Sequence, residues 1–173
     1  MKPRLDFHPR WHTAWQGHDI VVFRNGLEVD RIHASDIRRV IFVQSGEFLT
    51  AGDLECAVVE LDDQFVVFPA DTGFAGRVHF ERQSFWDSRA CIYWVSGCSG
   101  SLPSDCMRRR GFTFLRRVPR YARIERTRLA PVVESWCLEG PQTWDERRWS
   151  RIKSQRPFTN SIAASINAPD TAH

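Results

Sequence analysis

The residues best suited by type and spacing to bind a ligand are arginines in the second half of this chain. Nine arginines lie between residues 108 and 128, with a single acidic residue, Glu125, and three aromatic residues interleaved. Guanidinium groups can neutralise phosphates, and aromatic rings can stack on unpaired bases. The candidate residues for binding nucleic acid or a partner are Arg108, Arg109, Arg110, Arg116, Arg117, Arg120, Arg123, Arg126 and Arg128, with Phe112, Phe114 and Tyr121.

Charge is unevenly distributed along the chain, and this leaves three interpretations of the arginine tract open. Residues 1–107 carry 10 basic and 15 acidic side chains, a net charge of −5, whereas residues 108–173 carry 14 and 6, a net charge of +8. The tract can bind nucleic acid, or it can bind a protein partner or dock on the acidic front half of the same or a second chain. It can also reflect composition alone. We rank protein contact or docking above nucleic acid.

Other reactive residues do not assemble into a catalytic or metal-binding pattern. The sequence contains no Walker loop, GxGxxG, GxSxG, HExxH or paired CxxC motif. His8, His12 and His18 lie close together, but no Cys or carboxylate accompanies them at a recognised ligand spacing. The adjacent acids Asp62 and Asp63 suit a hairpin turn. We therefore predict no catalytic residue, no metal and no cofactor.

The cysteines are odd in number, and we expect them to be reduced thiols. A chain of 173 residues with 42% hydrophobic residues does not need disulfides to be stable. Cys91 or Cys98 with His79, inside the expected helix, is the remaining catalytic combination, and a plain surface or core histidine is the commoner case. The five cysteines are Cys56, Cys91, Cys98, Cys106 and Cys137.

Two hairpins and a strand between them are predicted in the first half of the chain. Asn25-Gly26 separates two apolar runs, and both residues tolerate the positive φ of a tight turn. Residues 37–43 are rich in β-branched side chains and predict a third strand. Residues 54–61 and 64–69 predict a second hairpin. Because neither face of residues 54–61 is wholly polar, this pair should lie near the middle of a sheet.

A helix and a further strand are predicted after the second hairpin. Asp71 or Thr72 can cap a helix that runs to Trp86, with apolar residues at helical spacing. Residues 89–95 are apolar and short, and we favour a strand there. The expected fold class is therefore α+β, with a mainly antiparallel sheet, one packed helix at about residues 71–86 and a basic C-terminal extension.

Five segments are expected. Residues 1–18 form an irregular lead-in, in which Trp11 and Trp15 can pin a turn of helix onto the body. Residues 19–95 form the core, and the Ser, Gly and Pro content of residues 96–107 indicates a linker. Residues 108–158 form the arginine-rich extension, with extended pieces at 111–115 and 131–138 and a short helix at 144–152. Residues 159–173 are small and polar, which predicts disorder.

The order of hairpin, strand, hairpin and helix resembles small bacterial PH-like domain proteins. The likeness covers residues 19–95 and lies in Ser35-Asp36-Ile37, in the turn after Val59-Glu60-Leu61, and in residues 69–74, Pro-Ala-Asp-Thr-Gly-Phe. The resemblance implies a bent sheet or partly open barrel closed by one helix, which is generally a binding platform without catalytic residues. It does not cover the arginine-rich extension, and it transfers no functional residue.

These features predict a non-catalytic binding module that recognises a protein partner, with a bacterial immunity or adaptor role as one form of it. The alternative is a nucleic-acid-binding protein that uses residues 108–128, and a hydrolase-like or metal enzyme ranks third. No window approaches about 18 uninterrupted apolar residues, and the N-terminus lacks the apolar core of a signal peptide. We therefore expect a cytoplasmic protein without membrane contact. The sequence leaves its oligomeric state open.

Overall fold

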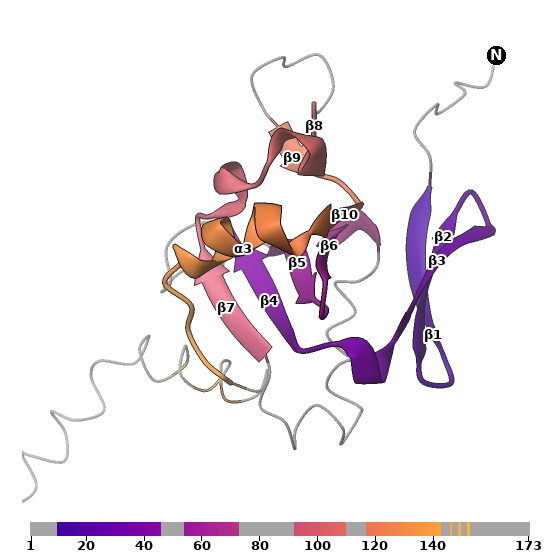
Figure 1. The fold of residues 1–173 in the computed structure, drawn as a ribbon, viewed down its shortest axis with the longest axis horizontal. Coiled ribbons are helices and arrows are strands. Elements are labelled where there is room, and N and C mark those ends of the chain that lie inside the picture. The colour runs from indigo at the N-terminus through magenta and orange to yellow at the C-terminus, as the bar shows by residue number, and fades with distance from the viewer. Residues whose placement is uncertain are drawn as a thin grey trace, which may run out of the picture.

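The computed structural model describes residues 10–45, 54–72, 92–109 and 117–142, together with residues 146, 149 and 152, which are helical. Within these ranges the protein contains a three-stranded, a five-stranded and a two-stranded sheet and the helix α3 (Arg126–Glu134) (Figure 1). The predicted α+β class is confirmed. Pairing is antiparallel except between two strands, and the five-stranded sheet is open, not closed into a barrel.

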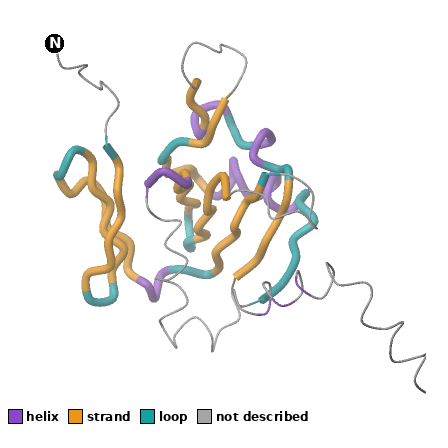
Figure 2. The backbone as a smooth tube through the Cα atoms, turned by 180° about the vertical axis from the view of Figure 1, so that it is seen from behind, coloured by secondary structure: helices purple, strands orange, loops and turns teal. Residues whose placement is uncertain are grey.

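The three-stranded sheet is an antiparallel meander of β1 (Trp11–Gln16), β2 (Asp19–Arg24) and β3 (Leu27–His33). The turn between β2 and β3 has φ of 53° at Asn25 and 82° at Gly26, so the predicted hairpin is confirmed. A short 3-10 turn, η1 (Ala34–Asp36), leads from β3 into the larger sheet. Figures 1 and 2 show the small sheet to one side of the larger one.

The prediction that residues 1–18 form an irregular lead-in is wrong for residues 11–16, which form the strand β1. Trp11 and Trp15 were expected to form a turn of helix, but β1 pairs with β2 over its whole length. A spacing of four residues places two side chains on the same face of a strand as well as of a helix, so this spacing does not discriminate between them. Both tryptophans pack against the core that the small sheet shares with the larger one.

The five-stranded sheet has the order β10-β6-β5-β4-β7. Its meander is β4 (Arg39–Gln44), β5 (Leu54–Glu60) and β6 (Gln64–Pro69), and the predicted second hairpin is therefore confirmed. The run at residues 89–95, for which a strand was favoured, gives β7 (Ile92–Ser96), which is parallel to β4. The edge strand β10 (Ala122–Glu125) is antiparallel to β6.

Both faces of the larger sheet are buried, and β5 lies in the middle of the strand order, as predicted. Val40, Phe42 and Val59 lie on the face that packs with Ile20 and other residues of the small sheet. On the opposite face, Ile41, Val58 and Phe65 pack with Leu129 and Val133 of α3 (Arg126–Glu134). The larger sheet is thus the middle layer between the smaller sheet and a helix.

The second half of the chain belongs to the same body. Leu102 and Cys106, in the segment expected as a linker, are buried in the core beside α3. This segment forms two 3-10 turns, η3 (Ser99–Ser101) and η4 (Ser104–Cys106), and leads into the hairpin of β8 (Met107–Arg109) and β9 (Arg117–Pro119). Because β10 completes the sheet beside β6, the extension adds to the core fold rather than standing apart from it.

Two further expectations concern helices. Residues 131–138 were predicted to be extended, but α3 occupies this stretch as far as Glu134, which corrects that prediction. Of the helix expected at residues 71–86, only Asp71 and Thr72 are described, and they lie in the 3-10 turn η2 (Ala70–Thr72). The remainder of that prediction lies outside the described residues. Among the described helices, none is long and apolar enough to cross a bilayer.

Candidate functional site

The arginines of the tract separate onto different parts of the fold instead of forming one patch within the described ranges. Arg123, on β10, reaches across to the small sheet and binds both carboxylate oxygens of Asp30, at 2.6 and 2.7 Å. The hydroxyl of Tyr121 donates to the same carboxylate. Tyr121 also stacks on Trp11, with ring centroids 5.0 Å apart. Arg123 and Tyr121 therefore fasten the two sheets together.

A second pairing joins the start of α3 to the end of β5. The carboxylate of Glu60 is 4% exposed and contacts Arg39 on the neighbouring strand and Arg126, whose Nη2 lies 2.7 Å from it. Arg126 also donates to the carbonyl oxygen of Leu61, at 3.2 Å. A buried carboxylate needs such partners, because removal from water is costly for an unpaired charge. Arg126 thus has a structural task that leaves little of its charge for a ligand.

A third pairing holds the turn η4 against α3. Arg128 lies 2.8 Å from Asp105, and Arg120 donates from Nε to the backbone oxygen of Asp105, at 2.6 Å. The hydrogen bond from Arg128 lowers the pKa of Asp105 below its ordinary value. Both Asp105 and Arg128 are partly exposed, so solvent screens this pair and it adds little stability.

The pairings match one of the interpretations of the tract, docking on the acidic front half of the same chain. Arg108, Arg123 and Arg126 pair with Asp71, Asp30 and Glu60 respectively. Arg109 is exposed in β8, and Arg117 extends from β9. The remaining members of the predicted set, Arg110, Phe112, Phe114 and Arg116, lie outside the described residues.

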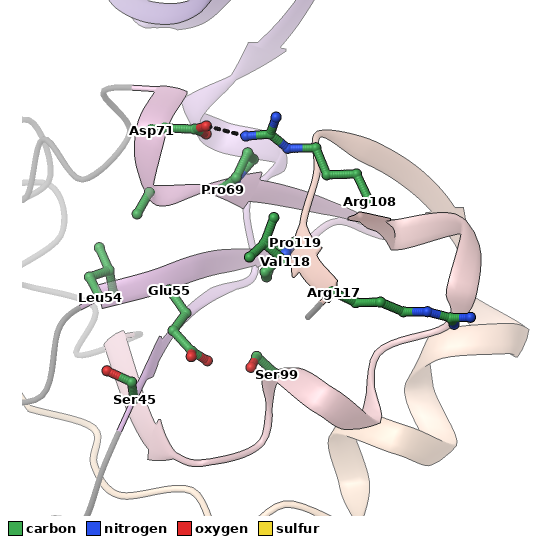
Figure 3. A pocket seen from close by; sticks show the side chains of 11 residues that line it. Ser45, Leu54, Glu55, Pro69, Asp71, Ser99, Arg108, Arg117, Val118 and Pro119 are labelled. Atoms are coloured by element: carbon green, nitrogen blue, oxygen red, sulfur yellow. Dashed lines mark hydrogen bonds and ion pairs between the residues drawn. The ribbon is translucent and has the colours of Figure 1, made fainter. Parts of the chain in front are cut away.

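A polar cavity of about 280 Å³ lies at the end of the larger sheet, where β5 begins and β4, β6 and β7 end (Figure 3). The β8–β9 hairpin closes one side of it, so two predicted residues, Arg108 and Arg117, belong to its lining. Its apolar wall includes Leu54, Pro69 and Val118. The described residues that line it are Ser45, Leu54, Glu55, Pro69, Ala70, Asp71, Ser99, Arg108, Arg117, Val118 and Pro119.

A β-bulge directs Glu55 into this cavity. Gln44 pairs with Leu54 and Val43 pairs with Cys56, so Glu55 is the extra residue of β5. Bulges interrupt the ladder and re-aim side chains, often beside functional sites. The Oε2 atom of Glu55 is buried and has no hydrogen-bond partner among the described residues, although Glu55 as a whole is only half-buried. Glu55 is thus a cavity carboxylate with an unsatisfied acceptor.

Sequence reasoning missed Glu55 as a site residue. A glutamate in an apolar strand is a visible signal, but alternation assigned it to an ordinary strand face. The bulge depends on the pairing of β5 with β4, and pairing registers cannot be read from one strand alone.

Two of the described thiols are buried, and three of the described histidines contact other rings. Burial raises the pKa of Cys56 and raises the pKa of Cys106 to about 12. The ring of His12 stacks on Phe23, and His18 lies beside His33. Within the described ranges, no group of three or more His, Cys, Asp or Glu side chains is placed to hold a metal ion. Cys91 and His79 lie outside those ranges.

The described residues define an α+β protein with an open, mixed sheet between a second sheet and a helix, and with a polar cavity at one sheet end. Comparisons of the chain with protein-family models, with curated proteins and with solved structures find no match.

Proposed function

We propose that this protein is a non-catalytic binding module that recognises a protein partner through the β2–β3 hairpin. The observation that carries the proposal is the exposure of two apolar side chains on that hairpin. Leu27 is 73% exposed and Val29 is 49% exposed. Apolar side chains surrounded by polar residues are typical of the centre of a protein interface. Arg24 and Glu28 are exposed polar neighbours on the same hairpin.

The hairpin favours recognition through side chains over the addition of a strand. Val22 pairs with Asp30 and Phe23 pairs with Glu28, so Val29 is an extra residue in β3. A bulge at a sheet edge disrupts the ladder and discourages a second strand from pairing there. A partner would therefore contact the side chains of Leu27 and Val29 and would not pair with the backbone along the outer edge of β3.

The arginine pairings support a protein partner over nucleic acid. Arg108, Arg123 and Arg126 each contact a carboxylate of the same chain, so binding phosphate would require these contacts to be replaced. The resemblance to PH-like domain proteins predicts a binding platform as well. We also propose a cytoplasmic location and a bacterial immunity or adaptor role.

The test begins with a photo-crosslinking amino acid at position 29, in cells that express the protein, to identify the partner. The affinity of the purified pair is then measured for wild type, Leu27→Lys and Val29→Lys, with Thr127→Lys on α3 as the control for added charge. We expect each hairpin variant to weaken binding at least tenfold, about 1.4 kcal/mol, and the control to bind as wild type. Equal affinity for all four proteins would rule the hairpin out.

An oligonucleotide titration separates the alternative. The proposal predicts no saturable binding at about 150 mM salt. Tight binding with a steep salt dependence, reduced by the double variant Arg116→Ala and Arg117→Ala, would instead support nucleic-acid recognition by residues 108–128.

A further inference from the structure

The polar cavity combines one unsatisfied carboxylate oxygen with apolar walls. The Oε2 atom of Glu55 is inaccessible to solvent and accepts no hydrogen bond from the part of the chain that the structure describes. Buried polar atoms in native proteins are almost always paired, and each exception calls for an explanation, of which a bound group is one. Such an atom is costly because its hydration has been lost without replacement. Rotation of the carboxyl group would turn this oxygen toward the cavity, where an occupant that donates a hydrogen bond would remove this cost.

The charges around the cavity favour a cationic occupant. The other acidic group in the lining, Asp71, is already paired with Arg108. Figure 3 shows the side chain of Glu55 directed toward Ser45 and Ser99, whereas the guanidinium group of Arg117 extends away from it. Glu55 therefore supplies the negative charge that is not paired with Arg108, and Ser45 and Ser99 lie in the same lining.

Size and composition narrow the occupant further. At about 280 Å³ the cavity is slightly smaller than most sites for drug-sized ligands, and it suits a group of side-chain size. Leu54, Pro69 and Val118 provide apolar contact for an aliphatic stem. A divalent cation such as Ca²⁺ requires about six to eight oxygen ligands, far more than one carboxylate and two hydroxyls supply.

We infer that this cavity binds an alkylammonium or guanidinium group on a short aliphatic stem, with Glu55 as its counter-ion. The group can belong to a free amine or to a lysine or arginine side chain of another protein. The inference does not rest on the proposed function, because the cavity and the β2–β3 hairpin share no residue.

The test measures binding of n-butylamine to the full chain by calorimetry and by amide chemical shifts, with n-butanol as the uncharged probe of similar shape. We expect a Kd on the order of 1 mM for the amine and at least tenfold weaker binding of the alcohol. Glu55→Gln should weaken amine binding at least tenfold. Glu134→Gln, the same change at an exposed position on α3, should have no effect.

Val118→Phe provides a second variant that fills the cavity and keeps the carboxylate. It should abolish amine binding, and a dispersed amide spectrum confirms that each variant is folded. Equal binding of butylamine by wild type, Glu55→Gln and Val118→Phe would overturn the inference, as would equal binding of the amine and the alcohol.

One further experiment distinguishes a free amine from a side chain as the source of the cation. Another tests the cavity independently of the hairpin proposal. If the peptide Ala-Lys-Ala binds with the same dependence on Glu55, the cavity accepts a side chain; if only butylamine binds, it accepts a small free amine. Val29→Lys should leave amine binding unchanged, so that a failure of the hairpin proposal does not affect the cavity.

Discussion

At the scale of single residues, buried or paired charges determine what each arginine can do. Glu60 is almost wholly buried and is shared by Arg39 and Arg126. Replacing an ion pair by apolar groups can be neutral, but removing one partner leaves an uncompensated charge in a poorly solvated place. Arg117 makes no comparable contact with a carboxylate in the described residues and extends into solvent.

We predict that Arg126→Leu lowers the free energy of unfolding by about 2 kcal/mol, below the full cost of breaking a buried pair because Arg39 remains beside Glu60. Urea denaturation monitored by tryptophan fluorescence measures this change. Arg117→Leu is the matched control and should stay within about 0.5 kcal/mol of wild type. Similar losses for both variants would contradict a specific role of Glu60.

A second prediction concerns the reactivity of the thiols. Because burial raises the pKa of Cys106 to about 12, only about one thiol in 10⁴ is ionised at pH 8, and burial raises the pKa of Cys56 as well. Cys137 is exposed. We expect alkylation at pH 8 to label Cys137 first, and Cys56 and Cys106 only after unfolding, as peptide mapping by mass spectrometry would reveal. Early labelling of Cys106 would contradict its burial.

The sign of the pH dependence follows from the same pKa values. A thiol that stays neutral in the folded protein but ionises near its ordinary pKa of 9.0 when unfolded stabilises the fold fully below that pH. The contribution falls as the pH rises from about 9 toward 12. Cys106→Ala should therefore weaken this alkaline loss of stability, although its cavity lowers stability at every pH.

At the scale of elements, a close backbone approach holds the C-terminal segment against β7. The amide of Trp94 donates to Glu139 and the amide of Glu139 donates to Trp94, at 2.9 and 2.8 Å. Gly140 follows with φ of 124°, and a Cβ atom there would lie 2.8 Å from the carbonyl oxygen of Ile92. A glycine is needed here because both the backbone conformation and the space exclude a side chain.

We predict that Gly140→Ala lowers the free energy of unfolding by about 2 kcal/mol, because the strand and the segment must separate to admit the methyl group. Gly100→Ala is the control, since a Cβ atom at Gly100 would meet nothing within 4 Å. It should change stability by less than about 0.5 kcal/mol. Thermal and urea unfolding of the two variants provide the comparison.

The same scale separates what the sequence could predict from what it could not. Asn25-Gly26 and the apolar faces of β5 are local signals, and they correctly predicted the hairpin and the central position of β5. The helix α3 was missed because Pro131 lies inside it, where proline is unfavourable, while the tertiary contacts of Leu129 and Val133 stabilise it.

Less of the candidate site than of the fold could be predicted from local sequence signals. The sequence identified Arg108 and Arg117 by composition, but it could not place them in a cavity opposite Glu55, since this arrangement joins strands that are far apart in the chain. It also could not show that Asp30, Glu60 and Asp71 are the partners of the tract. Long-range pairings of this kind are set by the assembled sheets and not by local pattern.

At the scale of the whole molecule, the two sheets are held together by a mixed polar and aromatic contact. The carboxylate of Asp30, on β3, accepts hydrogen bonds from Tyr121 and Arg123, and the ring of Tyr121 contacts the rings of Trp11 and Phe68. The side chain of Asp30 is 16% exposed, so its charge is poorly screened. This contact couples the position of the small sheet to β10.

We predict that Asp30→Ala loosens the small sheet without unfolding the larger one. Hydrogen exchange should accelerate at least tenfold in the amides of β1 to β3, whereas the amides of β5 should keep their protection. Glu28→Ala is the control, because among the described residues the carboxylate of Glu28 accepts its hydrogen bonds from Arg31 of its own strand. A uniform loss of protection in both sheets would indicate a single cooperative unit instead.

The place of β10 at the edge of the larger sheet has a consequence for incomplete chains. β6 contains Phe65, Val66, Val67 and Phe68 in succession, and β10 supplies the backbone partners along its outer side. A product that ends before residue 122 would present this uncharged strand with open hydrogen-bonding groups, a template on which copies can stack. Nascent or proteolysed chains that lack β10 should therefore aggregate. Because β10, which belongs to the arginine tract, pairs with the outer side of β6, it protects the full chain from this aggregation.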